Sequence, residues 1–179
     1  MVLDNYEIVI SEINMAKRQV FFSFHYDRDV WRAAMVRNMG KVDNSSTFSD
    51  NAWEGVRYQT DKKIKEWIDA QIAMRSCLVV LVGYETSQRK WVKYEIEKAM
   101  ELRKGIVGIR INKLKNGRGE QDPNGGNPFY NVLTSDGHRL SNYVTLYESS
   151  HSSSSYVYDD INDNIESLIE DAISNKWKY

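Results

Sequence analysis

The run Cys77 to Val82, CLVVLV, constrains the fold of this chain more than any other segment. Consecutive apolar residues without alternation are typical of a strand that is covered on both faces, as in a parallel sheet. Gly83 ends the run, and Thr86 or Ser87 can cap a helix that follows. The core stripe of this helix has helical spacing: Val92, Ile96, Ala99 and the aliphatic stem of Arg103. The segment therefore predicts a buried strand, a short loop and a helix.

Strands and helices alternate on both sides of this segment. Further strands are expected at 19–24, 105–111 and 144–147, and further helices from about residue 27, over 60–75 and from about residue 159. The first of these helices is predicted to bury Trp31, Ala34, Met35 and Met39. Surface loops are expected at 43–50 and 113–126, and a flexible turn at the serine-rich stretch 149–155. The alternation predicts an α/β fold, a parallel sheet with helices on both faces.

Length and charge limit the remaining possibilities. At 179 residues we expect a single domain over 15–179, with residues 1–14 as an N-terminal appendage before a second possible start at Met15. The 24 basic and 25 acidic residues nearly cancel, which argues against a general nucleic-acid binder. No apolar run approaches the roughly 20 residues that span a bilayer, and the acidic start is unlike a secretory signal. We expect a cytoplasmic protein without membrane or nucleic-acid partners.

Metal and cofactor signals are missing from the sequence. Cys77 is the one cysteine of the chain, and its place at the head of an apolar strand favours a structural thiol. The three histidines, His25, His138 and His151, lack metal-ligand spacing. No glycine-rich phosphate motif follows an expected strand. The sequence predicts neither a metal site nor a resident cofactor.

Glu95 is the carboxylate best placed for chemistry. It lies one turn from Trp91 on the helix that follows the buried strand, and it points toward the crevice where open α/β sheets bind ligands. The alternative is a solvated glutamate that pairs with Lys98 or with Arg89 and Lys90. Spacing alone favours this second interpretation, because most helix glutamates are solvated.

Aromatic side chains gather at the same expected edge of the sheet. Phe24, His25 and Tyr26 follow the first strand, and Trp53 and Trp91 come later in the chain. Such rings can stack on a base or a nicotinamide, and an arginine fork can meet a pyrophosphate. Trp31 and Trp67 are expected in the core instead. The candidate substrate-binding residues are Phe24, His25, Tyr26, Asp27, Trp53, Arg57 and Trp91, with Arg89 as a weaker candidate.

Two segments resemble the TIR-like domain family. Phe22-Ser23-Phe24 with the following His25-Tyr26-Asp27-Arg28-Asp29 resembles the opening strand and loop of TIR domains. Trp91-Val-Lys-Tyr-Glu95-Ile96 resembles the helix motif that carries the catalytic glutamate of NAD-consuming members. The similarity covers about residues 15–129 and is most specific to the group that includes the TIR component of bacterial Thoeris anti-phage defence systems.

The resemblance implies a flavodoxin-like or TIR-like fold, with Glu95 as the catalytic residue and NAD as the substrate. It also implies a cyclic ADP-ribose-type messenger that activates a partner effector. The expected second strand and its BB loop are not found in the polar segment 43–50, which puts assembly through that loop in doubt. The product, the infection trigger and the oligomeric state stay open.

Two other functions stay open at this stage. One is a TIR-like adaptor without catalytic activity, which recruits partners through its surface. The other is a nucleoside deoxyribosyltransferase-like glycosyl transfer, which also relies on a glutamate but uses nucleosides in place of NAD.

Overall fold

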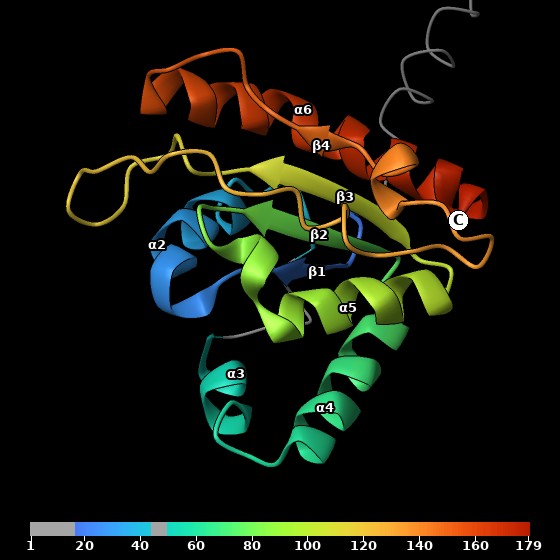
Figure 1. Ribbon diagram of the computed structural model, residues 1–179. Helices are drawn as coiled ribbons and strands as arrows, with labels where there is room; N and C mark the ends of the chain where they lie inside the picture. Colours follow the sequence, from blue (N-terminus) through green and yellow to red (C-terminus); the bar gives the residue numbers. More distant parts are fainter. Residues whose placement is uncertain (1–16, 44–49) are drawn as a thin grey trace, which may run out of the picture.

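The computed structural model describes residues 17–43 and 50–179, and its centre is a four-stranded sheet (Figure 1). The strands follow in the order of the sequence: β1 Val20–Ser23, β2 Cys77–Val82, β3 Gly105–Arg110 and β4 Leu146–Tyr147. Every neighbouring pair is parallel. The carboxyl ends of the strands therefore lie along one edge, where ligands bind in open α/β sheets. The predicted parallel sheet is confirmed.

Helices cover both faces of the sheet, as predicted. The α-helices are α2 Tyr26–Arg37, α3 Asp50–Val56, α4 Asp61–Ala73, α5 Lys90–Glu101 and α6 Ser154–Asn175, and the 3-10 helices are η1 Thr86–Gln88, η2 Leu140–Asn142 and η3 Lys176–Lys178. Helices α2 and α6 pack on one face, and α4 and α5 pack on the other (Figure 1). Among the described residues, no helix combines the length and the apolar character that a membrane span needs.

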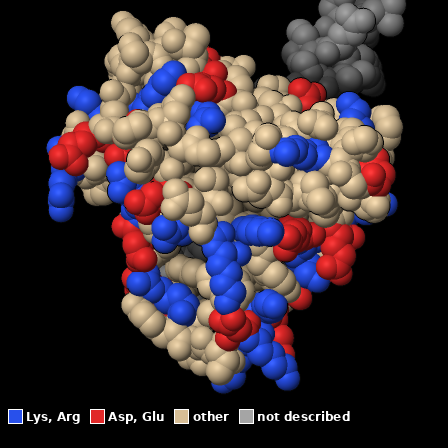
Figure 2. Space-filling view, viewed as in Figure 1, with Lys and Arg blue, Asp and Glu red and all other residues tan. Residues whose placement is uncertain are grey.

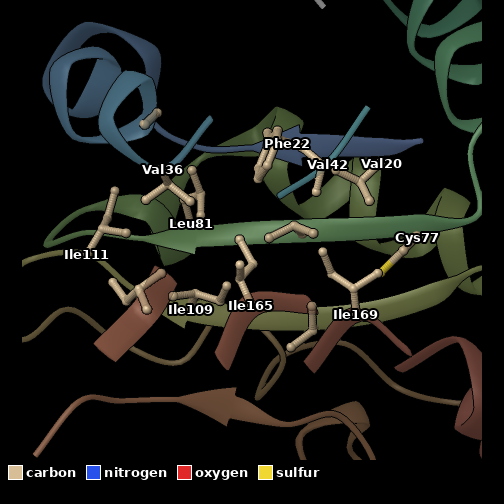
Figure 3. Close-up of a cluster of buried hydrophobic side chains, with 14 of the residues drawn as sticks. Val20, Phe22, Val36, Val42, Cys77, Leu81, Ile109, Ile111, Ile165 and Ile169 are labelled. Carbon is tan, nitrogen blue, oxygen red and sulfur yellow. The ribbon is translucent and has the colours of Figure 1, made fainter. Parts of the chain in front are cut away.

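The alternation of side chains along β2 explains why the strand is apolar throughout. Cys77, Val79 and Leu81 join the core under α2 and α6, whereas Leu78, Val80 and Val82 join the core under α4 and α5. Figure 3 shows Cys77 in the first of these cores, beside Ile169 of α6. Burial raises the pKa of the Cys77 thiol, which supports the structural role expected for it.

Helix α2 turns a different face to the core than the apolar pattern predicts. Trp31, expected to be buried, is 59% exposed, whereas Arg32 is fully buried. Met35 and Met39 pack only partly against the core. The helix begins at Tyr26 after His25. The prediction was wrong because a pattern of apolar residues cannot anticipate that a charged side chain finds enough partners to be buried.

The partners of Arg32 come from its own helix and from the long loop after β3. Its Nη1 donates to Asp29 Oδ1 at 2.9 Å and to Asp122 Oδ2 at 2.8 Å, and its Nε donates to the Leu114 carbonyl at 2.8 Å. A buried guanidinium with this many acceptors is compensated for the loss of water. Residues 113–126 form a loop without helix or strand, as predicted. The hydrogen bonds with Arg32 hold this loop against α2.

The start of α5 also differs from the prediction. Thr86 and Ser87 do not cap it, because they lie in η1, and α5 begins at Lys90. The Thr86 hydroxyl instead accepts a hydrogen bond from the Gly83 N–H at 2.9 Å. Arg103 lies beyond the helix in the left-handed region, with a φ of 53°, and is exposed. The remaining stripe of Val92, Ile96 and Ala99 is buried as predicted.

The serine-rich stretch before α6 is exposed at most positions, but some of its serines form hydrogen bonds with the loop after β3. Ser149 is buried, and its carbonyl accepts a hydrogen bond from Lys113 Nζ at 2.9 Å. Ser154, where α6 begins, accepts from the Lys115 N–H at 3.0 Å. These contacts with the 113–121 segment extend the helix beyond the start predicted near Asp159.

Two predictions concern residues that lie outside the described part of the chain. One is the appendage over 1–14, and the other is part of the polar segment 43–50. Between β1 and β2, the described residues contain helices and no strand.

We expect a chain that begins at Met15 to fold and to keep its activity, because β1 begins at Val20 and the described residues that line the cavity discussed below all follow it. Thermal unfolding of the full chain and of the shortened chain checks this prediction. A large drop in melting temperature on removal of residues 1–14 would show that Ile8, Val9 and Ile10 pack as part of the fold.

Candidate active site

A cavity of about 330 Å³ opens where β1 ends, beside the start of α2, α3 and the first turns of α5. Its lining residues are Phe22, Phe24, His25, Tyr26, Asp27, Trp53, Arg57, Tyr58, Arg89, Trp91, Val92 and Glu95. The structure therefore brings together every residue that the sequence analysis names as catalytic or substrate-binding. Their roles remain predictions.

Glu95 lies in the second turn of α5 with its side chain turned inward. It is 6% exposed, and its Oε2 accepts a short hydrogen bond from the Ser23 hydroxyl. Ser23 is the last residue of β1 and is itself buried. The carboxylate is thus held at the carboxyl end of the first strand.

The alternative of a solvated, ion-paired Glu95 is wrong. Lys98 pairs with Glu101 at 2.8 Å, and Lys90 pairs with Asp61. Arg89 Nη2 lies 3.2 Å from Glu85. Each cation that was expected to pair with Glu95 has another carboxylate as its partner.

Burial decides the electrostatics of Glu95. It raises the pKa of this carboxyl to about 8, and the hydrogen bond from Ser23 opposes the rise only in part. The sequence left open whether the helix N-terminus and Arg89, Lys90 and Lys93 would outweigh burial, and they do not. In the absence of a ligand, most molecules carry a protonated Glu95 at pH 7.

Aromatic rings form much of the cavity wall. Phe24 and Tyr26 stack with their centroids 6.2 Å apart. Trp53 on α3 contacts Trp67 on α4, with centroids 5.9 Å apart, which fixes one side of the wall. Trp67 packs against the core, as expected. Trp91 lines the cavity on the helix that carries Glu95.

The two arginines of the cavity have different surroundings. Arg57 donates to Asp27 at 2.8 Å and lies over the rings of Tyr26 and Tyr58. Arg89 has one nitrogen on Glu85, whereas its Nε is buried without a hydrogen-bond partner. Arg89, the weaker candidate in the sequence, therefore keeps a free donor at the cavity.

His25 lies at the edge of the cavity as a neutral side chain. Burial and then the charge of Arg89 lower the pKa of its imidazole, so it is uncharged at pH 7. Its Nδ1 is buried without a hydrogen-bond partner, 3.6 Å from a Glu85 oxygen.

Ser23, which holds the Glu95 carboxylate, is a residue to which the sequence analysis assigned no role at the site, and Tyr58 in the cavity wall is another. The sequence feature that could have indicated a role for Ser23 is its hydroxyl group, which lies between Phe22 and Phe24 in a predicted buried strand. A polar group in such a place needs a hydrogen-bond partner. The partner is a carboxylate 72 positions later, which only the pairing of β1 with β2 and the packing of α5 bring near. Among the described residues, no group of three or more metal-ligating side chains is placed to hold a metal ion.

The parallel α/β sheet, with a glutamate of α5 buried against the end of β1 at an aromatic cavity, is the arrangement expected of a TIR-like domain. The family model described as "Thoeris protein ThsB, TIR-like domain" matches residues 21–116, which include β1 from its second residue, Glu95 and β3. A relative from Bacillus cereus (strain MSX-D12), named "Putative cyclic ADP-D-ribose synthase ThsB1", is 38% identical over 137 residues, covering 72% of this chain and 71% of the relative. The chain belongs to the ThsB family of TIR-like domains.

Proposed function

We propose that this protein cleaves NAD between nicotinamide and ribose, and makes a cyclic ADP-ribose-type messenger that activates a partner effector in anti-phage defence. The observation that carries the proposal is the buried carboxylate of Glu95 at an aromatic-lined cavity in a ThsB-family domain. The name of the Bacillus cereus relative supports the same class of product.

A single carboxylate is sufficient for this reaction. Hydrolysis of an O-glycoside usually requires a second carboxyl group to protonate the leaving oxygen. Nicotinamide in NAD is cationic, so it takes both electrons of the breaking C–N bond and leaves as a neutral molecule without a proton. The remaining positive charge on the ribose is the charge that Glu95 stabilises.

The raised pKa of Glu95 suits a cationic ligand. In the free protein the carboxyl is mostly protonated at pH 7, because burial raises its pKa to about 8. A positive charge bound beside it favours the ionised form and lowers that pKa. Binding of NAD therefore creates the anion that the reaction needs, and the Ser23 hydroxyl positions it.

The surroundings of the ribose decide the product. Once nicotinamide has left, water attack on the ribose carbon gives ADP-ribose, whereas attack by an atom of the ADP moiety gives a cyclic product. Phe24, Trp53 and Trp91 in the cavity wall offer aromatic surface, and a ligand that folds back over such a surface is shielded from water, which favours cyclisation.

Incubation of the purified protein with NAD, followed by separation of the products, tests the proposal. Nicotinamide with a cyclic product supports it. An adaptor consumes nothing, and a deoxyribosyltransferase-like enzyme exchanges the base of a nucleoside but leaves NAD intact. Protein isolated from infected cells is included, since the family resemblance implies an infection trigger.

The messenger is expected to act at a distance from the protein. Protein-free filtrate from infected cells that express this chain should activate the purified effector encoded beside it, and filtrate from Glu95→Gln cells should not. Such a ligand must bind the active conformation of the effector more tightly than the resting one. Effector activity is the measurement. Activation only when the two proteins are mixed would favour the adaptor.

A further inference from the structure

A second cavity lies next to the one that contains Glu95. Its volume is about 620 Å³, and it lies between the start of α2, Glu85 and the segment 116–122. His25 and Asp27 line both cavities. These two residues are therefore shared by the walls of both cavities. In Figure 1 the first turn of α2 and the loop after β3 lie at the same side of the sheet, at the carboxyl ends of the strands.

The Glu95 cavity alone is small for a dinucleotide. Pockets for drug-sized ligands measure about 300–1,000 Å³, and the Glu95 cavity of about 330 Å³ is at the lower limit. NAD consists of two nucleotides joined through a diphosphate. With nicotinamide and its ribose at Glu95, the adenosine half must extend into a neighbouring space, and the second cavity has the larger volume.

Trp31 gives the second cavity an aromatic surface. The side chain lines this cavity although it is 59% exposed, and it packs against the chain at Gly117, where an added Cβ would lie 3.5 Å from the indole. Because Trp31 is largely exposed, its indole ring contributes little to the hydrophobic core. Its face can stack on a purine, which is a strong and sequence-tolerant contact for a base.

The second cavity is lined by four carboxylates and three arginines, and Arg118 is the arginine among them that can face a phosphate. The acidic residues that line it have partners: Asp27 pairs with Arg57, Glu85 with Arg28 and Arg89, Asp122 with Arg28 and Arg32, and Glu120 accepts a hydrogen bond from Asn116. Arg118 also lines the cavity and forms no ion pair with any residue that the structure describes. Arg89, with its unpartnered Nε, lines the Glu95 cavity and not the second one.

We propose that the second cavity binds the adenosine diphosphate half of the substrate, with Trp31 stacking on the adenine and Arg118 facing the phosphates. The proposal rests on NAD as the substrate proposed above. The nicotinamide half then occupies the Glu95 cavity, and His25 and Asp27 lie between the two halves.

Equilibrium titration of the full chain with ADP tests the proposal, since ADP lacks the nicotinamide half and needs no turnover. Tryptophan indole N–H signals in NMR spectra follow the binding. We expect the parent to bind ADP. Trp31→Ala should weaken ADP binding by about tenfold or more, because stacking of a base on an aromatic ring contributes about 1–3 kcal/mol to binding. Arg118→Ala is also expected to weaken ADP binding relative to the parent, whereas Trp31→Phe should keep most of the affinity for ADP.

Trp177→Ala is the matched control, because Trp177 is 71% exposed and lies at the end of the chain, outside both cavities. Glu95→Gln should also bind ADP like the parent. Absence of ADP binding to the parent, or equal affinity of the parent and Trp31→Ala, overturns the proposal. NAD turnover is measured separately, so intact ADP binding without nicotinamide release would reject the proposed reaction and keep the site.

Discussion

Replacement of Glu95 by glutamine is expected to leave the fold intact and to reduce nicotinamide release by about a hundredfold or more. Glutamine has nearly the same shape and can still accept the hydrogen bond from Ser23, but it carries no negative charge. Loss of a main group that stabilises charge in the transition state commonly has an effect of this size. The measurement is nicotinamide release from NAD by the purified variant under conditions in which the parent is active.

Glu97→Gln is the control for this prediction, since the same chemical change is made two positions later on α5. Glu97 is exposed and lies 3.8 Å from Lys93, and an exposed pair within one helix contributes little. We expect this variant to turn over NAD like the parent. Equal activity of Glu95→Gln and the parent would show that another residue stabilises the ribose cation.

Local sequence patterns predict the sheet well, because each strand and its covering helices follow from burial. The run CLVVLV is apolar on both faces and becomes β2, with its alternate residues in two cores. Val92, Ile96 and Ala99 define the buried face of α5, which in turn sets the direction of Glu95. These features depend on residues near one another in the chain.

Features that depend on distant partners could not be predicted in this way. Arg32 is buried because Asp122 and the Leu114 carbonyl reach it from the loop after β3, and Trp31 is exposed as a result. The link between Ser23 and Glu95 joins a strand to a helix far along the chain. The pKa of Glu95 depends on how deeply its carboxyl group is buried, and the spacing of residues in the sequence does not reveal that depth. Residue types and spacing therefore predicted the candidate site, the family resemblance gave Glu95 its expected role, and the structure gave the electrostatics of the site.

Mixed charges over the surface agree with the near-neutral composition. Figure 2 shows basic and acidic side chains interspersed on the face in view. Ion pairs such as Arg28 with Asp122 join side chains of opposite charge. Glu95 differs from these carboxylates, since it is buried with a hydroxyl as its partner and pairs with no cation in the described part of the chain. An arrangement that leaves a carboxylate ready for a cationic ligand is unfavourable for the free fold.

The thermal stability of Glu95→Gln relative to the parent is therefore expected to increase with pH. The pKa of Glu95 is about 8 in the folded protein and near 4.5 in the unfolded chain. Between these values the folded state holds a proton that the unfolded state releases, so the free energy of unfolding falls as pH rises. Each unit of pKa difference corresponds to about 1.4 kcal/mol, which gives a total of a few kcal/mol. Glutamine does not titrate and avoids this loss.

Melting temperatures of the parent, Glu95→Gln and Glu97→Gln between pH 5 and pH 9 measure this effect. For a chain of this length, about 2–4 °C is expected for each kcal/mol. The difference between Glu95→Gln and the parent should be small near pH 5, widen up to about pH 8 and then stay constant, because Glu95 is then ionised in both states. The melting temperature of Glu97→Gln should change with pH as that of the parent does, because both proteins keep the titratable carboxyl group of Glu95. A difference that does not change with pH would mean that the Glu95 carboxylate is already ionised in the folded protein, and that a cationic ligand is not needed to create the anion.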